Sequence, residues 1–247
     1  CRIDGKEIDV EGGISIEDAK QTAVYAEKAG ADAVHISAYG NPAKSAAFTK
    51  APLVHEPCGF VDFAAAIKKC VNIPVITVGR IEPEQGDAAI KDGRADFVAM
   101  ARKLIVEPNL PLKIMESSLD DIRPCIACYT CVGEIFQNKS LQCASNPIAG
   151  RESEFATDQT ATKKRVLVIG GGPGGMEAAR TAALCGHSVT LCDKGNKLGG
   201  TLFFASILEK DNGKLMDWLI RQIKKLPVDV RLETDITPEF VQSLNPD

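Results

Sequence analysis

Long apolar runs and blocks of basic residues are both missing from this sequence of 247 residues. A membrane-spanning helix needs about 20 consecutive apolar residues, whereas the apolar runs here extend over only a few, so the sequence predicts no membrane span and no signal peptide. Lys and Arg number 29 against 33 Asp and Glu, and no basic stretch is long enough to follow a phosphate backbone. Membranes and nucleic acids are therefore not expected partners.

Disulfide bonds are not needed to stabilise a chain of this size. Apolar residues make up 45% and charged residues 25% of the sequence, which is typical of globular proteins. At about 150 residues per domain, the length corresponds to one large domain or two modest ones. The nine cysteines are an odd number in such a chain, which indicates a reducing compartment and favours a cytoplasmic location.

The first part of the chain, residues 1–115, alternates helix-like and strand-like stretches. A helix is expected after Ser15, which can form a capping box with Asp18, and before Gly30, a typical helix terminator. Further helices are predicted at 61–70 and 83–91, and strands at 33–37, 74–78 and 96–100. This order is typical of an α/β fold with mostly buried parallel strands.

The periodicity stops at residues 116–162, where clustered cysteines precede a polar stretch, so we interpret this part as a cofactor segment followed by a linker. An α/β pattern begins again at residues 163–247. Strands are expected at 165–169 and 188–192, and helices at 174–184 and 215–226. The second helix is amphipathic and includes Trp218. The sequence thus predicts two α/β parts joined by a cysteine-bearing segment.

The second α/β part opens with a G-x-G-x-x-G motif formed by Gly170, Gly172 and Gly175. The motif lies between a predicted strand and a predicted helix, and Asp193 follows the next strand, which is the context of a dinucleotide-binding turn. Such a turn brings a helix N-terminus to a pyrophosphate, while the carboxylate accepts ribose hydroxyls. The alternatives are that the glycine turn binds no ligand and that Asp193 is an ordinary surface acid.

Four cysteines fall within a short segment with the spacing C-x2-C-x2-C-x11-C, formed by Cys125, Cys128, Cys131 and Cys143. Zinc sites usually show two separated pairs, whereas a close run with one distant cysteine suits an iron–sulfur cubane held by four thiolates. Zinc and a metal-free segment are the alternatives. The flanking pairs Arg123-Pro124 and Asn146-Pro147 are interpreted as ordinary turn residues.

Two arginines follow neighbouring predicted strands, in the pairs Gly79-Arg80 and Ala101-Arg102. The carboxyl ends of parallel strands form the functional face of βα folds, where a phosphate could bind backbone amides and a guanidinium group. Surface ion pairs are the alternative. His35 and Tyr39 lie at the end of another strand, and either could donate a proton to a ligand, although His35 could equally be a packed core residue.

Four of the remaining cysteines are interpreted as small packing residues. They are Cys58, Cys70, Cys185 and Cys192.

The glycine turn, the four cysteines and the two arginine pairs together resemble one family over nearly the whole chain. They resemble the iron–sulfur flavoenzymes of the old yellow enzyme superfamily, which include 2,4-dienoyl-CoA reductase and trimethylamine dehydrogenase. The family implies the C-terminal half of a TIM (β/α)8 barrel at 1–115, a 4Fe-4S segment at 116–162, and the start of a Rossmann-like domain at 163–247.

The same resemblance implies three cofactors. FMN would be held by Arg2, Gly79, Arg80, Ala101 and Arg102, the first against the isoalloxazine ring and the others at the phosphate. The four cysteines would hold the 4Fe-4S cluster. FAD, or ADP alone as in some relatives, would lie against the second α/β part at Gly170, Gly172, Gly174, Gly175, Asp193, Gly200 and Thr201.

This sequence departs from the family pattern in two ways. Dienoyl-CoA reductases carry an acid–base histidine where the loop here has Asn41, which makes Tyr39 our substitute proton donor, with His35 as the second candidate. The chain also begins at about the fifth barrel strand and ends within the dinucleotide module, so we expect an internal piece of a longer protein, inactive alone.

The resemblance implies electron transfer from NAD(P)H through FAD and the 4Fe-4S cluster to FMN, which delivers hydride to the C=C bond of an α,β-unsaturated carbonyl or thioester. The substrate would be a small molecule such as a CoA thioester, and a homo-oligomer is the assembly to test. Two alternatives stay open: an amine dehydrogenase of the trimethylamine dehydrogenase type, and a non-catalytic electron-transfer or cofactor-binding module.

Overall fold

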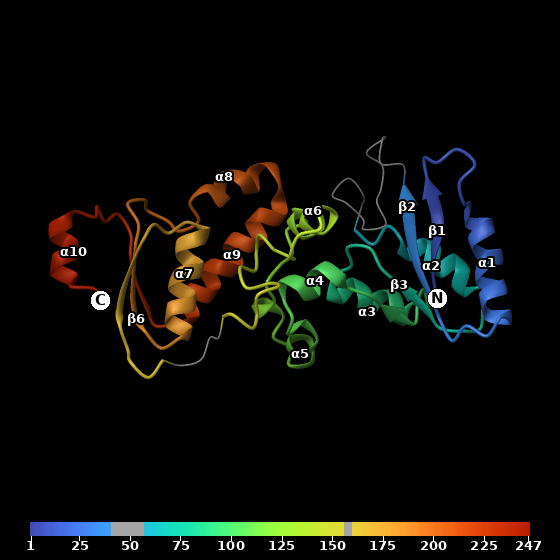
Figure 1. Ribbon diagram of the computed structural model, residues 1–247, viewed down its shortest axis with the longest axis horizontal. Coiled ribbons are helices and arrows are strands. Elements are labelled where there is room, and N and C mark those ends of the chain that lie inside the picture. The colour runs from blue at the N-terminus through green and yellow to red at the C-terminus, as the bar shows by residue number, and fades with distance from the viewer. Residues whose placement is uncertain (41–56, 156–159) are drawn as a thin grey trace. The chain divides into compact units, whose positions relative to one another are not determined.

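The computed structural model describes residues 1–40, 57–155 and 160–247. The chain forms two compact units, Cys1–Ala101 and Arg102–Asp247. Each unit contains one parallel sheet, drawn in Figure 1. The predicted α/β class with parallel sheets is confirmed. The first unit ends ahead of residue 115, where the sequence pattern places the end of the barrel part.

The sheet of the first unit has its strands in sequential order, each parallel to the next. The strands are β1 (Arg2–Ile8), β2 (Val34–Gly40), β3 (Val75–Thr77) and β4 (Phe97–Val98). Sequential order is the arrangement of a (β/α) barrel, whereas a doubly wound sheet reverses its order at a switch point. The sheet therefore has the topology of a portion of a barrel.

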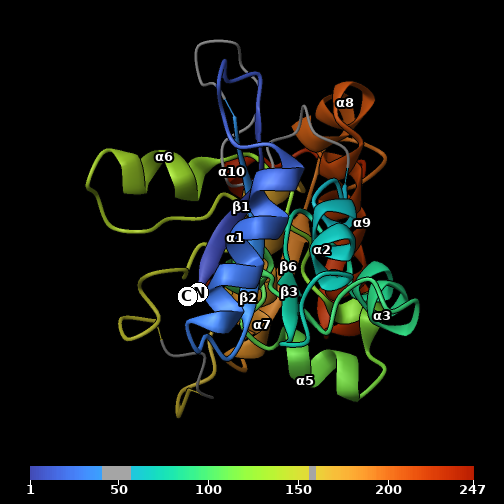
Figure 2. The same ribbon diagram turned by 90° about the vertical axis from the view of Figure 1, so that its right-hand side faces the viewer.

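The helices of this unit connect successive strands. They are α1 (Ile16–Lys28), α2 (Val61–Lys68) and α3 (Pro83–Lys91). Ser15 and Asp18 form the predicted capping box, and Gly30 follows the helix with φ of 93°. Helices α1 and α2 pack together against the sheet, as Figure 2 shows, and bury a core that includes Ala23, Ile36 and Ile67.

The stretch after the first sheet is more helical than its sequence suggests. It contains α4 (Ala101–Val106), α5 (Leu110–Met115), the 3-10 turn η2 (Leu119–Asp121) and α6 (Thr130–Phe136). Each has at most seven residues, too few to show the periodicity of an amphipathic helix. The loss of periodicity after residue 116 is thus compatible with a short helix at Thr130–Phe136, which the sequence did not predict.

The second unit has a three-stranded parallel sheet in the order β5-β6-β7. Its strands are β5 (Arg165–Ile169), β6 (Ser188–Cys192) and β7 (Val228–Arg231). Its helices are α7 (Pro173–Leu184), α8 (Thr201–Leu208), α9 (Lys210–Lys225) and α10 (Pro238–Leu244). Strands β5 and β6 have the predicted bounds, and α7 begins one residue before the predicted start.

Helix α9 packs against α7, the helix that contacts all three strands of this sheet. Leu215, Trp218, Leu219 and Ile223 are buried and recur at the spacing of one helix face. They pack against Met176 and its neighbours on α7. The predicted amphipathic helix is confirmed, and this core fixes α7, which carries the glycine turn, against the sheet.

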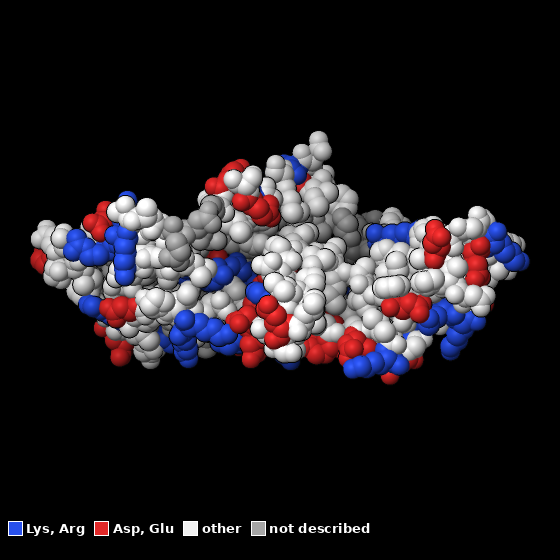
Figure 3. All heavy atoms as spheres, turned by 90° about the horizontal axis from the view of Figure 1, so that it is seen from below, with Lys and Arg blue, Asp and Glu red and all other residues white. Residues whose placement is uncertain are grey.

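Acidic and basic side chains are interspersed over the face of the protein drawn in Figure 3. Among the residues described, no helix is both long and apolar enough to span a bilayer.

Candidate functional site

In the glycine turn between β5 and α7, two glycines have a geometric reason and two border open space. Gly170 has φ of 104°, a conformation that favours glycine. A Cβ atom on Gly175 would lie 1.8 Å from the Gly170 carbonyl oxygen, so helix and strand approach too closely for a side chain. Cβ atoms on Gly172 and Gly174 would meet nothing within 4 Å, which leaves open space beside the helix N-terminus.

Asp193, directly after β6, uses both carboxylate oxygens to hold backbone amides. The Gly171 amide donates to Oδ2 at 2.5 Å, and the Gly195 amide donates to Oδ1 at 2.6 Å. Each oxygen keeps a second lone pair that could accept a ribose hydroxyl. This half-buried carboxylate therefore shapes the glycine turn, and its role toward a ribose stays a prediction.

A second glycine pair, Gly199 and Gly200, packs against the first turn. The Gly199 amide donates to the Gly171 carbonyl oxygen at 2.9 Å. Gly200 has φ of 51°, and a Cβ atom there would lie 2.9 Å from the Gly172 Cα atom. Thr201 follows as the exposed first residue of α8. The structure thus brings the predicted dinucleotide-binding residues of two distant segments together.

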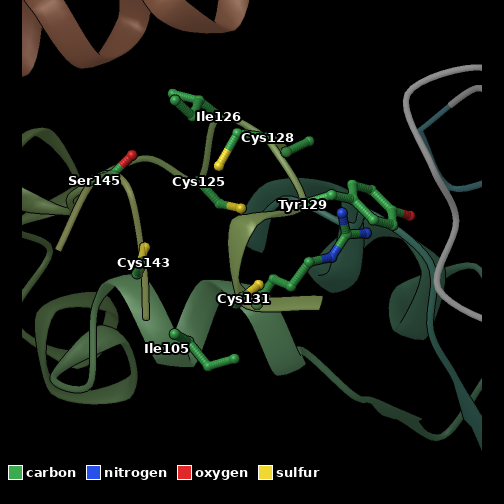
Figure 4. Close-up of a pocket in the computed structure, with 10 residues that line it drawn as sticks. Ile105, Cys125, Ile126, Cys128, Tyr129, Cys131, Cys143 and Ser145 are labelled. Carbon is green, nitrogen blue, oxygen red and sulfur yellow. The ribbon is translucent and has the colours of Figure 1, made fainter. Parts of the chain in front are cut away.

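The four clustered cysteines line a single pocket of the second unit (Figure 4). Cys131 lies on α6, Cys125 and Cys128 precede that helix, and Cys143 comes from the returning chain. Burial raises the pKa of the Cys125 thiol, and burial followed by the three neighbouring thiols raises that of Cys131. The structure therefore brings together all four residues that the sequence pattern grouped.

The four thiols surround the pocket without converging on one point. Within the described ranges, no three His, Cys, Asp or Glu side chains approach closely enough to hold a single metal ion. A zinc ion needs every sulfur at about 2.3 Å, whereas a four-iron cluster takes one thiolate for each iron. The described thiols therefore line one pocket but do not form a single-ion site.

Arg102 lines the same pocket, although the sequence assigned it to a flavin phosphate. Its guanidinium carbon lies 4.8 Å from the centroid of the Tyr129 ring, a cation–π distance. Tyr129 has φ of 64° and directly precedes α6. Ala101 is the last residue of the first unit and Arg102 the first of the second, so their shared role at a phosphate stays a prediction.

Polar side chains gather on one face of β1 and β2 in the first unit. Arg2 is paired in register with His35, and its Nε donates to the Ser37 hydroxyl at 3.2 Å. Alternate residues share a face of a strand, so Tyr39 lies on the same face as His35 and Ser37. Burial, followed by the charge of Arg2, lowers the pKa of His35, and its Nε2 has no hydrogen-bond partner among the described residues.

Gly79 and Arg80 follow β3, as predicted, and both have positive φ angles of 120° and 50°. A Cβ atom on Gly79 would lie 2.9 Å from the Phe60 ring, so this glycine also has a packing reason. Asn41, at the position of the family histidine, lies outside the described residues.

The other cysteines do not all pack inside the protein. Cys192 is buried and Cys58 and Cys185 are half-buried, but Cys70 is exposed, so its interpretation as a packing residue was wrong. The sequence pattern extended the helix to residue 70, whereas α2 ends at Lys68 and Cys70 lies in the exposed turn that follows.

The residues flanking the cysteine segment are buried and bonded, although the sequence suggested ordinary turns. Arg123 is 7% exposed and Asn146 is 4% exposed. The Asn146 side-chain amide donates to the Ile105 carbonyl oxygen at 3.1 Å. The position of an arginine and an asparagine beside prolines at both ends of the segment was the only signal that could have revealed them.

Two family descriptions match the chain. The NADH:flavin oxidoreductase / NADH oxidase family matches residues 8–121, and the FAD dependent oxidoreductase description matches residues 165–245. The first covers most of the barrel-like unit, and the second begins at β5.

Two relatives resemble the sequence over most of its length. An NADH oxidase of Thermoanaerobacter brockii is 43% identical over 96% of this chain and 37% of its own. A cinnamate reductase of Clostridium sporogenes is 35% identical over 79% of this chain and 30% of its own. The chain therefore spans about a third of the length of these relatives.

Two solved structures have the same fold. A 2-naphthoyl-CoA reductase in complex with 2-naphthoyl-CoA superposes with a TM-score of 0.91 at 30% identity, over 100% of this chain and 38% of that one. A histamine dehydrogenase from Rhizobium sp. 4-9 superposes with a TM-score of 0.85 at 25% identity, over 97% of this chain and 35% of that one.

The barrel-like sheet and the dinucleotide turn, with these matches, define a flavin-dependent oxidoreductase class with FMN- and FAD-binding portions. The chain belongs to the NADH:flavin oxidoreductase / NADH oxidase family.

Proposed function

We propose that the protein uses NAD(P)H to reduce a C=C bond conjugated to a carbonyl or thioester, with FAD, a 4Fe-4S cluster and FMN carrying the electrons. In this reaction the alkene gains a hydride at the β-carbon and a proton at the α-carbon, while NAD(P)H is oxidised to NAD(P)+. The observation that carries the proposal is the pocket of four cysteines in the same unit as the dinucleotide turn.

The cysteine pocket supports a cluster by its donor set. Cys125, Cys128, Cys131 and Cys143 would each ligate one iron, and all four line one pocket. Burial of Cys125 and Cys131 would shield the cluster from water.

The dinucleotide turn supports FAD binding because it leaves open space beside Gly172 and Gly174. Gly172 and Gly174 leave room for a pyrophosphate beside the N-terminus of α7, where backbone amides and the helix dipole favour an anion. Asp193 would accept the ribose hydroxyls, and Gly200 and Thr201 would approach from the second turn. A bound ADP would use the same residues.

The polar face of β1 and β2 supports an FMN site there. The buried Nε2 atom of His35 has no hydrogen-bond partner among the described residues, and it lies on the residue paired with Arg2. Arg2 would lie against the isoalloxazine ring. Gly79, Arg80, Ala101 and Arg102 are the proposed phosphate residues, on their sequence positions alone. Tyr39 would donate the proton to the substrate α-carbon, and His35 is the second candidate.

The substrate class is supported by two of the similar proteins, one named a cinnamate reductase and the other solved with 2-naphthoyl-CoA. The similarity to a histamine dehydrogenase favours a second candidate function, in which an amine is oxidised and electrons leave to an external acceptor.

The proposal is tested with protein purified anaerobically, in which FMN, FAD, iron and acid-labile sulfide are quantified. Steady-state assays then compare cinnamate and an enoyl-CoA with NADH or NADPH against methylated amines with a dye acceptor. Alkene reduction with all three cofactors supports the proposal. Zinc without sulfide would overturn the electron-transfer scheme, and turnover of amines alone would favour the dehydrogenase. Bound cofactors without turnover of either class would indicate a non-catalytic module.

A further inference from the structure

Arg123 lies two residues before the first cysteine of the pocket and is almost completely buried. Its guanidinium Nη1 donates to the Ser145 carbonyl oxygen, and Nη2 donates to Glu177 Oε1 at 2.8 Å. The face of the Trp218 ring lies against the same group, with 4.4 Å from the guanidinium carbon to the ring centroid. The Arg123 backbone amide is also bonded, to Glu107 Oε2 at 3.2 Å.

These contacts join the two ends of the cysteine segment. Arg123 directly precedes Pro124 and Cys125, and Ser145 follows Cys143 by two residues. The bond between the Arg123 guanidinium and the Ser145 carbonyl therefore closes the loop that contains all four cysteines. A loop closed at its base samples fewer conformations, so the ligands lose less entropy when they hold a cofactor.

The same side chain ties this loop to the dinucleotide-binding helix. Glu177 lies on α7, four residues after Pro173, where the helix begins. Its Oε1 also accepts from Arg180 Nη1 at 3.2 Å, and Arg180 lies 5.2 Å from the Trp218 ring centroid. One carboxylate thus holds two guanidinium groups on one aromatic ring, and the Arg123 group also bonds to the cysteine segment.

Stability alone does not account for this buried cluster of charges. Glu177 Oε2 and Arg180 Nε are buried and have no hydrogen-bond partner among the described residues. Burying charged groups without full pairing costs free energy, and apolar side chains of similar volume are often equally stable in such places. What an apolar side chain could not do is hold the Ser145 carbonyl, Glu177 and Trp218 at one fixed point.

We propose that Arg123 is a positioning residue for the cofactor of the four-cysteine pocket. It fastens both ends of the cysteine loop to α7, and so holds Cys125 and Cys143 at the separation that ligation requires. This proposal rests on the proposed function, since it takes the cofactor to be an iron–sulfur cluster.

The test compares Arg123→Gln, Arg123→Lys and the matched control Arg180→Gln in protein purified anaerobically. Arg180 shares Glu177 and Trp218 with Arg123, but within the described residues neither its hydrogen bond nor its ring contact reaches the cysteine segment. Three quantities are measured: iron and sulfide per chain, the rate at which a chelator bleaches the cluster absorbance, and the electron paramagnetic resonance spectrum after reduction.

We expect Arg123→Gln to lose its cluster to the chelator about tenfold faster than the wild type and to broaden the resonance spectrum. Arg123→Lys should retain its cluster better than Arg123→Gln but less well than the wild type. Its ammonium group can bond to the Ser145 carbonyl oxygen or to Glu177, but not to both in the geometry of a guanidinium group. Arg180→Gln should stay within about twofold of the wild type. If Arg123→Gln fails to fold, Glu177→Gln, which weakens the same attachment, should show a smaller loss of retention.

Equal bleaching rates in Arg123→Gln and Arg180→Gln would overturn the proposal, because a general loss of stability would then explain both. If Arg123→Gln does not fold and Glu177→Gln is tested in its place, equal bleaching rates in Glu177→Gln and the wild type would overturn the proposal. A wild type without acid-labile sulfide would overturn the proposed function and this proposal with it. If the wild type holds the cluster and Arg123→Gln loses it no faster, this proposal is overturned but the proposed function is not.

Discussion

The position of a Cβ atom on Gly175 lies 1.8 Å from the carbonyl oxygen of Gly170, far inside any contact that real atoms make. The obstacle is the backbone of Gly170, directly after β5, and Gly175 is part of the backbone of helix α7. No flexible side chain can therefore move aside to relieve the contact. One residue earlier, a Cβ atom on Gly174 would meet nothing within 4 Å. Gly175 is therefore required by close backbone packing, whereas its neighbour Gly174 is not.

Gly175→Ala should lower the stability of the second unit, because helix and strand must separate to admit the methyl group. Overpacking of this kind costs about 1–3 kcal/mol, and more where only backbone can move. Gly174→Ala is the matched control and should leave the thermal midpoint unchanged or slightly raised, because alanine favours a helix. Circular dichroism melts of both variants check this, and equal midpoints would contradict it.

Cys128→Ser should abolish the iron–sulfur cluster, because a four-iron cluster needs a thiolate for each iron. Iron and acid-labile sulfide per chain should fall to near zero, while FAD content stays close to that of the wild type. Cys185→Ser is the control, since Cys185 is half-buried at the end of α7 and does not line the pocket. Loss of iron in both variants would mean that the cysteine set is wrongly assigned.

Local contacts explain why much of the fold could be predicted from the sequence. Ser15 and Asp18 are three residues apart, and their capping box set the start of α1 correctly. The glycine turn is equally local, since its strand, turn and helix are consecutive. In both cases the residues that interact are also the residues that form the motif.

Contacts between distant segments explain what the sequence could not show. The Trp218 indole nitrogen donates to the Asp121 carbonyl oxygen, 97 residues away, and Arg123 bonds to Glu177, 54 residues away. No periodicity or spacing relates such pairs, so a buried arginine looked like a turn residue. The cysteine segment was recognised because its spacing is itself the signal, whereas the residues that hold it in place are spread over three elements.

Stability of the first unit should depend on pH through Asp96. A hydrogen bond from the Lys68 ammonium group, followed by one from the Val75 amide, lowers the pKa of this carboxyl. Because the folded pKa lies below the unfolded value of about 4, the ionised carboxylate stabilises the fold above that pH. This contribution is lost as pH falls through the folded pKa.

Asp96→Asn should therefore lower the free energy of unfolding at pH 7 by about 1 kcal/mol, a modest value because the ion pair is partly exposed. The difference between variant and wild type should shrink as pH falls below about 4. Asp87→Asn, which removes a more exposed ion pair with Lys91, should change stability less than Asp96→Asn does. Urea titrations at several pH values check this, and a difference independent of pH would contradict it.

Tyr39→Phe should slow alkene reduction with little effect on cofactor content, if this phenol donates the proton to the substrate. Tyr39 lies on the polar face of β2 with His35, and phenylalanine keeps the ring while removing the acidic hydroxyl. A positioned general acid contributes roughly 100-fold or more, so kcat should fall by about that factor.

The rate at which NAD(P)H reduces the bound flavins should stay unchanged in Tyr39→Phe, because that half of the reaction needs no proton donor at the substrate. Tyr25→Phe is the matched control, since Tyr25 is 61% exposed on α1. Stopped-flow measurement of flavin reduction and reoxidation separates the two halves. An unchanged reoxidation rate in Tyr39→Phe, with a large loss in His35→Gln, would assign the proton to His35 instead.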